Sequence, residues 1–144
     1  LYSGAIANQI QLSKDNKMLL LEASLLHDIG KALIPSEIIQ KPSRLTPEER
    51  EIINLHSQLG YEILKTTPIE SDVAELVRLH HTPFSKRNCN MLAQILSVSD
   101  VFSALKEERA YKKSMSDEQA FRIMTDVPYL SNDFVGVLRC TRNS

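Results

Sequence analysis

Apolar residues recur three or four positions apart along most of the chain, and no stretch shows the strict alternation typical of a strand. This spacing predicts helices over residues 1–10, 14–27, 36–40, 47–65, 71–81, 89–107 and 117–125, with a last helix beginning near residue 133. Residues 82–88 are polar and contain a proline, so we expect a loop there. The predicted fold class is all-α, a compact bundle of about six to seven helices.

Capping residues mark several of the predicted helix starts. Thr46 and Glu49 have the spacing of a capping box, and so have Ser116 and Gln119. Ser13 is placed to cap the helix over residues 14–27. These signals predict the starts of three helices to within a residue or two.

The helix over residues 14–27 has two further features. Its apolar content, concentrated in residues 18–26, predicts burial on most of its faces. Gly30 follows its end, where helices commonly stop at a left-handed residue, so we expect a positive φ at Gly30.

The candidate chemistry lies in histidines and aspartates on or at the ends of these helices. The residues are His27, Asp28, His56, His80, His81 and Asp100. Each one alone is compatible with an ordinary structural role. Together they place four imidazoles and two carboxylates on four consecutive helices, mostly among apolar residues, where an unpaired carboxylate is unfavourable. We therefore expect these six residues to converge as metal ligands in the core of the bundle.

Six ligands are too many for one tetrahedral zinc ion and suit two divalent transition-metal ions. Imidazole-rich ligation disfavours Mg²⁺ and Ca²⁺, favours iron or manganese, and leaves zinc, cobalt and nickel open. Two such ions exceed the charge of the two aspartates, which suits a phosphate ester as substrate. A metal-bridged hydroxide would then be the nucleophile at neutral pH.

Length and composition fit one soluble domain over residues 1–144, and the first residue, Leu1, indicates a fragment of a longer protein. The net charge of −1 argues against a partner such as a nucleic acid duplex. Residues 18–21, the longest apolar run, are too short for membrane insertion, and no signal peptide is visible, so we expect a cytoplasmic protein. Cys89 and Cys140 are expected to be free thiols.

Several segments in order resemble a known family. They are Leu25 to Lys31, Ile34-Pro35, Lys41 to Glu49, His56 with Gly60, His80-His81, Val98 to Leu105 and Arg109 to Lys112. The first resembles the signature of HD-domain phosphohydrolases. The whole set is similar to the HD-GYP branch, whose members hydrolyse cyclic di-GMP.

The resemblance implies roles for individual residues. It implies that the six histidines and aspartates bind the metals and that Asp28 bridges them. It also implies that Lys31, Arg109 and Lys112 contact the phosphates of a small nucleotide substrate, which makes Asp28 and Lys31 the candidate catalytic residues. Domains of this kind are often fused to a sensory or receiver domain.

The chain departs from the family pattern in two places. The Gly-Tyr-Pro loop that follows the His-His pair is absent, because only residues 82–90 separate His81 from Met91. A third-metal ligand that related proteins draw from the first helix would lie before Leu1, so either it lies upstream in a longer protein or this domain has at most a two-metal site. The leading function is therefore a metal-dependent phosphodiesterase or phosphohydrolase. The alternatives are a non-catalytic signalling or interaction module and an HD-class nucleotidase, and the oligomeric state is open.

Overall fold

The computed structural model describes residues 2–82, 90–107 and 114–143. The elements are α1 (Tyr2–Gln9), α2 (Lys14–Leu26), a 3₁₀ helix η1 (Ile29–Leu33), α3 (Ser36–Ile39), α4 (Pro47–Asn54), α5 (His56–Leu64), α6 (Ser71–Leu79), α7 (Met91–Lys106), α8 (Asp117–Thr125) and α9 (Asn132–Asn143). No strand occurs among these residues, so the predicted all-α class is confirmed. The helices are somewhat more numerous than expected, mainly because one predicted helix is divided in two.

The predicted caps are present. Thr46 and Glu49 form a capping box at α4, and Ser116 and Gln119 form another at α8. The Ser13 hydroxyl accepts a hydrogen bond from the Asn16 amide at 3.2 Å, which caps α2. These short-range hydrogen bonds satisfy amides that the first helical turn leaves unpaired, which is why the starts were visible in the sequence.

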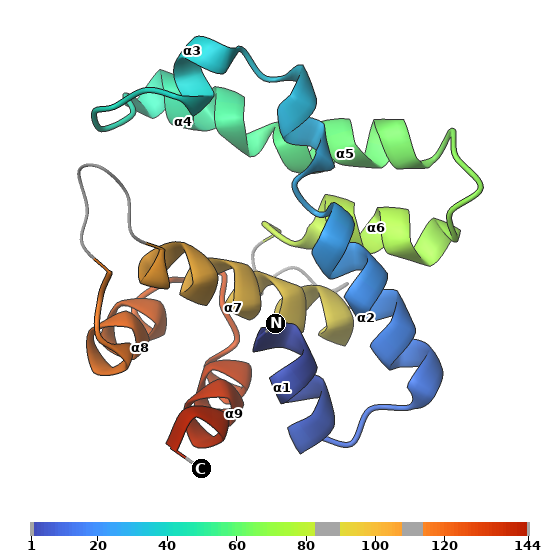
Figure 1. The fold of residues 1–144 in the computed structure, drawn as a ribbon, viewed down its shortest axis with the longest axis vertical. Helices are drawn as coiled ribbons and strands as arrows, with labels where there is room; N and C mark the ends of the chain where they lie inside the picture. The colour runs from blue at the N-terminus through green and yellow to red at the C-terminus, as the bar shows by residue number, and fades with distance from the viewer. Residues whose placement is uncertain (1, 83–89, 108–113, 144) are drawn as a thin grey trace.

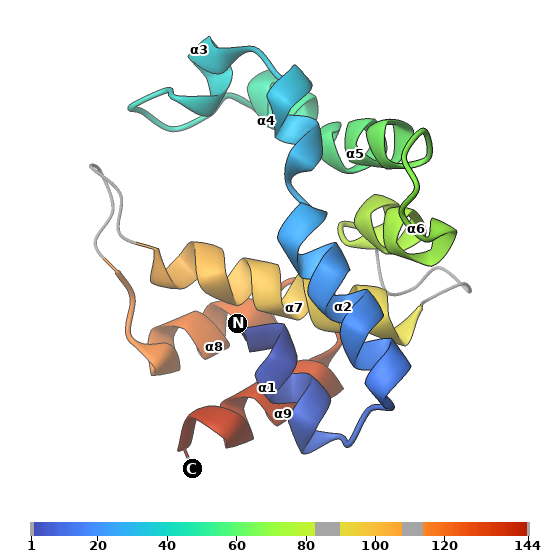
Figure 2. The same cartoon turned by 45° about the vertical axis from the view of Figure 1, so that its right-hand side comes forward.

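The main core forms around α7, which crosses the middle of the molecule in Figure 1. One face of α7 buries Ile95, Val98 and Phe102 against residues from α1, α2, α6, α8 and α9. A smaller cluster of Leu64, Ala74 and Val77 joins α5 to α6. Both views place α3 and α4 on the far side of α7 from α9, with η1 and α5 leading back to the core (Figures 1 and 2).

The prediction that α2 is buried on most faces is wrong. Only Leu20 and Ala23 of this helix are buried, whereas Met18, Leu21 and Leu25 are 48%, 42% and 68% exposed. The helix packs against α1, α6 and α7, and these neighbours cover one side of it. Apolar content alone therefore overstated how much of its surface the fold covers.

The single helix predicted over residues 47–65 is broken at Leu55, between α4 and α5. Two backbone carbonyl oxygens at the break accept hydrogen bonds from side chains. His56 Nδ1 donates to Ile53 O at 2.6 Å, and Ser57 Oγ donates to Asn54 O at 3.3 Å. The break makes His56 the first residue of α5 and turns its imidazole inward, where it is only 2% exposed.

No helix in the described parts of the chain has both the length and the apolar character that a bilayer crossing requires. Cys140 is an exposed thiol, and Cys89 lies outside the described residues.

Candidate metal centre

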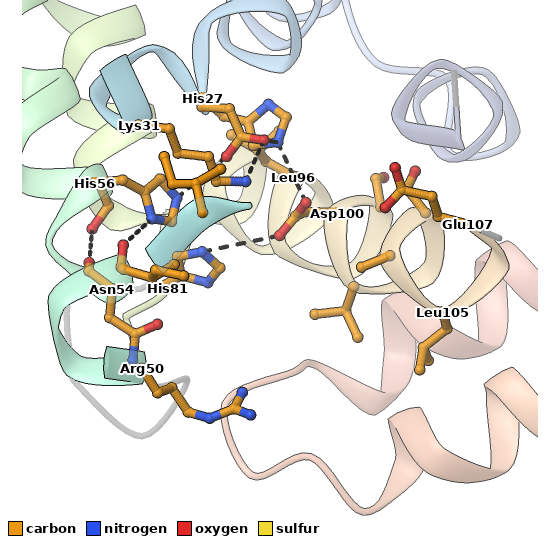
Figure 3. A pocket seen from close by; sticks show the side chains of 18 of the residues that line it. His27, Lys31, Arg50, Asn54, His56, His81, Leu96, Asp100, Leu105 and Glu107 are labelled. Carbon is orange, nitrogen blue, oxygen red and sulfur yellow. Dashed lines mark hydrogen bonds and ion pairs between the residues drawn. The ribbon is translucent and has the colours of Figure 1, made fainter. Parts of the chain in front are cut away.

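The structure brings the six histidines and aspartates together, and we call them the His/Asp cluster: His27, Asp28, His56, His80, His81 and Asp100. They come from the end of α2, the start of η1, the start of α5, the end of α6 and the middle of α7. Figure 3 shows several of them facing one another across these elements.

Two carboxylates connect the imidazoles. Asp28 lies between two histidines, with Oδ2 at 3.5 Å from His27 Nε2 and Oδ1 at 3.4 Å from His56 Nε2. Asp100 does the same on the other side, with Oδ1 at 3.3 Å from His27 Nε2 and Oδ2 at 4.0 Å from His81 Nε2. His80 closes the group, because its Nε2 is 3.2 Å from His56 Nε2.

Backbone carbonyls set the orientation of three of the rings. His27, His56 and His80 each direct Nδ1 at the carbonyl oxygen three residues earlier, at 3.0, 2.6 and 2.6 Å. A carbonyl only accepts, so each Nδ1 carries the proton, and the neutral rings of His56 and His80 present a lone pair at Nε2. This arrangement is typical of metal-binding histidines, whose second ring nitrogen is held by an outer hydrogen bond.

The local environment keeps most of these imidazoles neutral. Burial lowers the pKa of His56, and burial together with the charge of His81 lowers the pKa of His80 to about 3. Burial likewise lowers the pKa of His81 to about 4, against the opposing effect of Asp100. The Nε2 lone pairs of His56 and His80 are therefore unprotonated at neutral pH, although they face each other.

His27 and Asp100 show the opposite balance. Burial lowers the pKa of His27, but its hydrogen bond to Asp100 and the charges of Asp28 and Asp100 outweigh burial and raise it. Burial raises the pKa of Asp100, but the hydrogen bond from His27 and the positive charge of nearby imidazoles lower it to about 2. The carboxylate of Asp100 is therefore ionised in the cluster.

These observations test whether a metal fits the site. Two facing lone pairs at 3.2 Å repel each other unless a cation lies between or beside them. His56, His80 and His81 can offer nitrogen atoms that all lie within 4.8 Å of one another, and two carboxylates flank them. The donor set is mixed nitrogen and oxygen, the kind that transition-metal ions prefer. The residues present fit a metal centre.

A close backbone approach holds two parts of the cluster together. A Cβ placed on Gly30 would lie 2.0 Å from the carbonyl oxygen of His56 and 2.5 Å from the amide nitrogen of Gly60. η1 and α5 can therefore pack with Asp28 beside His56 only because residue 30 is glycine. No glycine among the described residues has a positive φ, so the predicted left-handed conformation of Gly30 is wrong. The glycine is needed for space and not for φ.

A cleft of about 1360 Å³ adjoins the cluster. His27, Asp28, His56, His81 and Asp100 line it, and His80 is fully buried behind them. Lys31 also lines the cleft, and its Nζ donates to Asp28 Oδ2 at 2.7 Å. Arg109 and Lys112, the other two predicted phosphate-binding residues, lie outside the described residues.

Three other residues of this cleft have no signal in the sequence pattern: Arg50, Asn54 and Tyr129. Arg50 and Asn54 lie one turn apart on α4, and the Tyr129 ring meets His81 edge-on at 6.4 Å between centroids. Arg50 and Asn54 precede His56 by six and two residues, but the break at Leu55 that decides their direction has no clear sequence signal.

The HD domain family model matches residues 2–127. This chain belongs to the HD domain family. A cyclic di-GMP phosphodiesterase of Thermotoga maritima is 36% identical over 131 residues, which cover 83% of this chain and 36% of that protein. A cyclic di-GMP phosphodiesterase response regulator of Xanthomonas campestris is 31% identical over 129 residues, 82% of this chain and 34% of that protein.

A 3'3'-cGAMP-specific phosphodiesterase of Vibrio cholerae is also similar, at 30% identity over 135 residues, 87% of this chain and 29% of that protein. The resemblance to the HD-GYP branch is thus confirmed at the level of the domain. The HD domain described here spans about a third of the length of these curated relatives.

Proposed function

We propose that this HD domain is a metal-dependent phosphodiesterase that hydrolyses a nucleotide phosphate ester such as a cyclic dinucleotide. The observation that carries the proposal is the pair of Nε2 lone pairs of His56 and His80 facing each other at 3.2 Å, inside a ring of further nitrogen and carboxylate donors. Such an arrangement is unfavourable without a bound cation, and His56 lines an open cleft.

All six residues of the His/Asp cluster would hold the metals, and Asp28 would bridge them because it lies between His27 and His56. Two divalent transition-metal ions, with iron or manganese favoured, match this number of donors. Bound metal ions lower the pKa of water and offset the negative charge of a phosphoryl group, which are the two requirements of ester hydrolysis at neutral pH.

The protein's own groups bind and orient the substrate. Lys31 is held by Asp28 at the wall of the cleft, and its side chain is 38% exposed, so its ammonium can contact a phosphate oxygen beside the cluster. The carbonyl contacts of His27, His56 and His80 hold the rings in place before substrate arrives, so binding does not have to order them.

The substrate class follows from the relatives. Those described above are named as phosphodiesterases for cyclic di-GMP or for 3'3'-cGAMP, and both molecules are cyclic dinucleotides with two phosphodiester bonds. The donor set and the charge of the cleft suit this class, which we extend to this chain as a proposal.

Metal content and hydrolysis test the proposal together. We expect about two transition-metal ions per chain in protein purified without chelator, and metal-dependent hydrolysis of cyclic di-GMP and of bis(p-nitrophenyl) phosphate. Asp28→Ala should lose both metal and activity. Asp126→Ala, which removes an exposed carboxylate at the end of α8, is the matched control and should keep both.

The opposite result is equally clear. Protein that takes up no metal after anaerobic reconstitution with iron or manganese, or that hydrolyses cyclic di-GMP equally well without metal, would overturn the proposal. The first result would favour a non-catalytic signalling module.

A further inference from the structure

Four lysines and arginines line the cleft among the described residues: Lys31, Lys41, Arg50 and Arg78. Three of them have a carboxylate partner. Lys31 donates to Asp28, Lys41 donates to both oxygens of Glu49 at 2.7 and 2.6 Å, and Arg78 makes a two-pronged contact with Glu75.

Arg50 differs from these three. Within the described parts of the chain, its guanidinium makes no hydrogen bond or ion pair, and Figure 3 draws it extended away from α4 without a dashed contact. Two acids adjoin Arg50 in the sequence of α4, Glu49 and Glu51. Glu49 is already engaged with Lys41 and with the Thr46 amide, and Glu51, which the structure also describes, makes no ion pair with Arg50. Among the described residues, Arg50 is therefore a cation of the cleft whose charge no carboxylate offsets.

Arg50 lies in the same cleft as the metal centre. It lies one turn before Asn54 on α4, and both residues line the cleft together with Tyr129. Figure 3 draws Arg50 on the side of His81, whereas Lys31 lies beside Asp28, to which it donates a hydrogen bond.

A cyclic dinucleotide presents two phosphates, and only one of them can be at the metals while its ester is cleaved. The other must lie elsewhere in the cleft, whose volume of about 1360 Å³ is enough for a ligand of that size. A guanidinium presents two parallel N–H donors that match a phosphate, and it binds phosphate best when no carboxylate competes for it.

We propose that Arg50 binds the second, non-reacting phosphate of a cyclic dinucleotide and so makes the cleft selective for substrates with two phosphates. This inference rests on the proposed function. Arg50 acts as a specificity-determining residue that touches substrate, and it takes no part in bond cleavage.

The test compares two substrates that share the reacting bond type. Cyclic di-GMP carries two phosphates, and bis(p-nitrophenyl) phosphate carries one. We expect Arg50→Gln to raise KM for cyclic di-GMP about tenfold, the usual contribution of one hydrogen bond to a charged group, with a much smaller change in kcat. The ratio of kcat/KM for cyclic di-GMP to that for bis(p-nitrophenyl) phosphate should fall by the same factor.

Two variants control the interpretation. Arg50→Lys keeps the charge and should recover part of the lost selectivity. Arg44→Gln removes an exposed arginine from the loop before α4 that does not line the cleft, and it should leave the ratio of the two substrates as in the wild type. Thermal unfolding of all three variants checks that the fold is intact, which is expected for side chains outside the core.

The outcomes separate the two proposals. If the metal-loaded wild type hydrolyses neither substrate, the proposed function fails, and this inference fails with it. If both are hydrolysed and Arg50→Gln leaves the ratio unchanged, or slows both substrates equally, the inference about Arg50 is wrong while the proposed function stands.

Discussion

Replacing Gly30 with alanine tests how the metal centre is assembled. The added methyl group would lie 2.0 Å from the His56 carbonyl oxygen, 2.5 Å from the Gly60 amide nitrogen and 2.9 Å from the His56 carbonyl carbon. All three obstacles are backbone atoms of α5, so no side-chain rotation can relieve the contact. η1 and α5 must separate, by roughly 1 Å or more, before ordinary van der Waals distances return.

The expected effect on stability is large. Overpacking of this kind costs about 1–3 kcal/mol, and we expect the upper end because only rigid backbone can move. The free energy of unfolding of a domain of this size is about 5–15 kcal/mol, so the variant should still fold. The separation would also widen the 3.4 Å gap between Asp28 Oδ1 and His56 Nε2. We therefore expect the variant to lose most of its bound metal while it keeps most of its free energy of unfolding.

Gly136→Ala is a matched control, because a Cβ at Gly136 in α9 would meet nothing within 4 Å. The same chemical change should stabilise the protein there by about 0.5–1 kcal/mol. Urea unfolding followed by circular dichroism would measure both variants, and elemental analysis would measure their metal content. Equal stability of the two variants, or full metal content in Gly30→Ala, would refute the reasoning about the backbone contact.

Two further predictions follow from burial. In the metal-free protein, His56, His80 and His81 have pKa values below that of an unfolded histidine, so the unfolded state binds more protons and stability should fall as the pH drops from about 6.5 toward 4. The raised pKa of His27 opposes this loss of stability, but it is one histidine against three. A urea midpoint that stays flat or rises on acidification to pH 5 would contradict the prediction. On α2, Leu20→Ala should cost about 2–5 kcal/mol, because Leu20 is 1% exposed, whereas Leu25→Ala at 68% exposed should change stability by less than about 0.5 kcal/mol. Thermal or urea unfolding checks the pair, and equal losses would contradict the burial assigned to α2.

The sequence alone predicts the local features of the fold and which residues come together in the His/Asp cluster. Capping at Ser13, Thr46 and Ser116 depends on residues within three positions of one another, so these helix starts were predicted correctly. The convergence of the six residues of the His/Asp cluster was also predicted, because carboxylates and imidazoles on apolar helices are unfavourable unless they find partners. That they bind metal stays a prediction. The motif resemblance added their order and expected roles.

Only the tertiary structure decided how these parts meet. The break at Leu55, the close approach at Gly30 and the exposed face of α2 depend on which neighbours each helix packs against, and helical periodicity contains no information about those neighbours. The same holds for Arg50, whose position in the helical pattern is that of an ordinary solvent-exposed arginine. Its importance comes from the cleft it enters and from the absence, among the described residues, of a carboxylate to pair with it, and both properties arise from segments far apart in the chain.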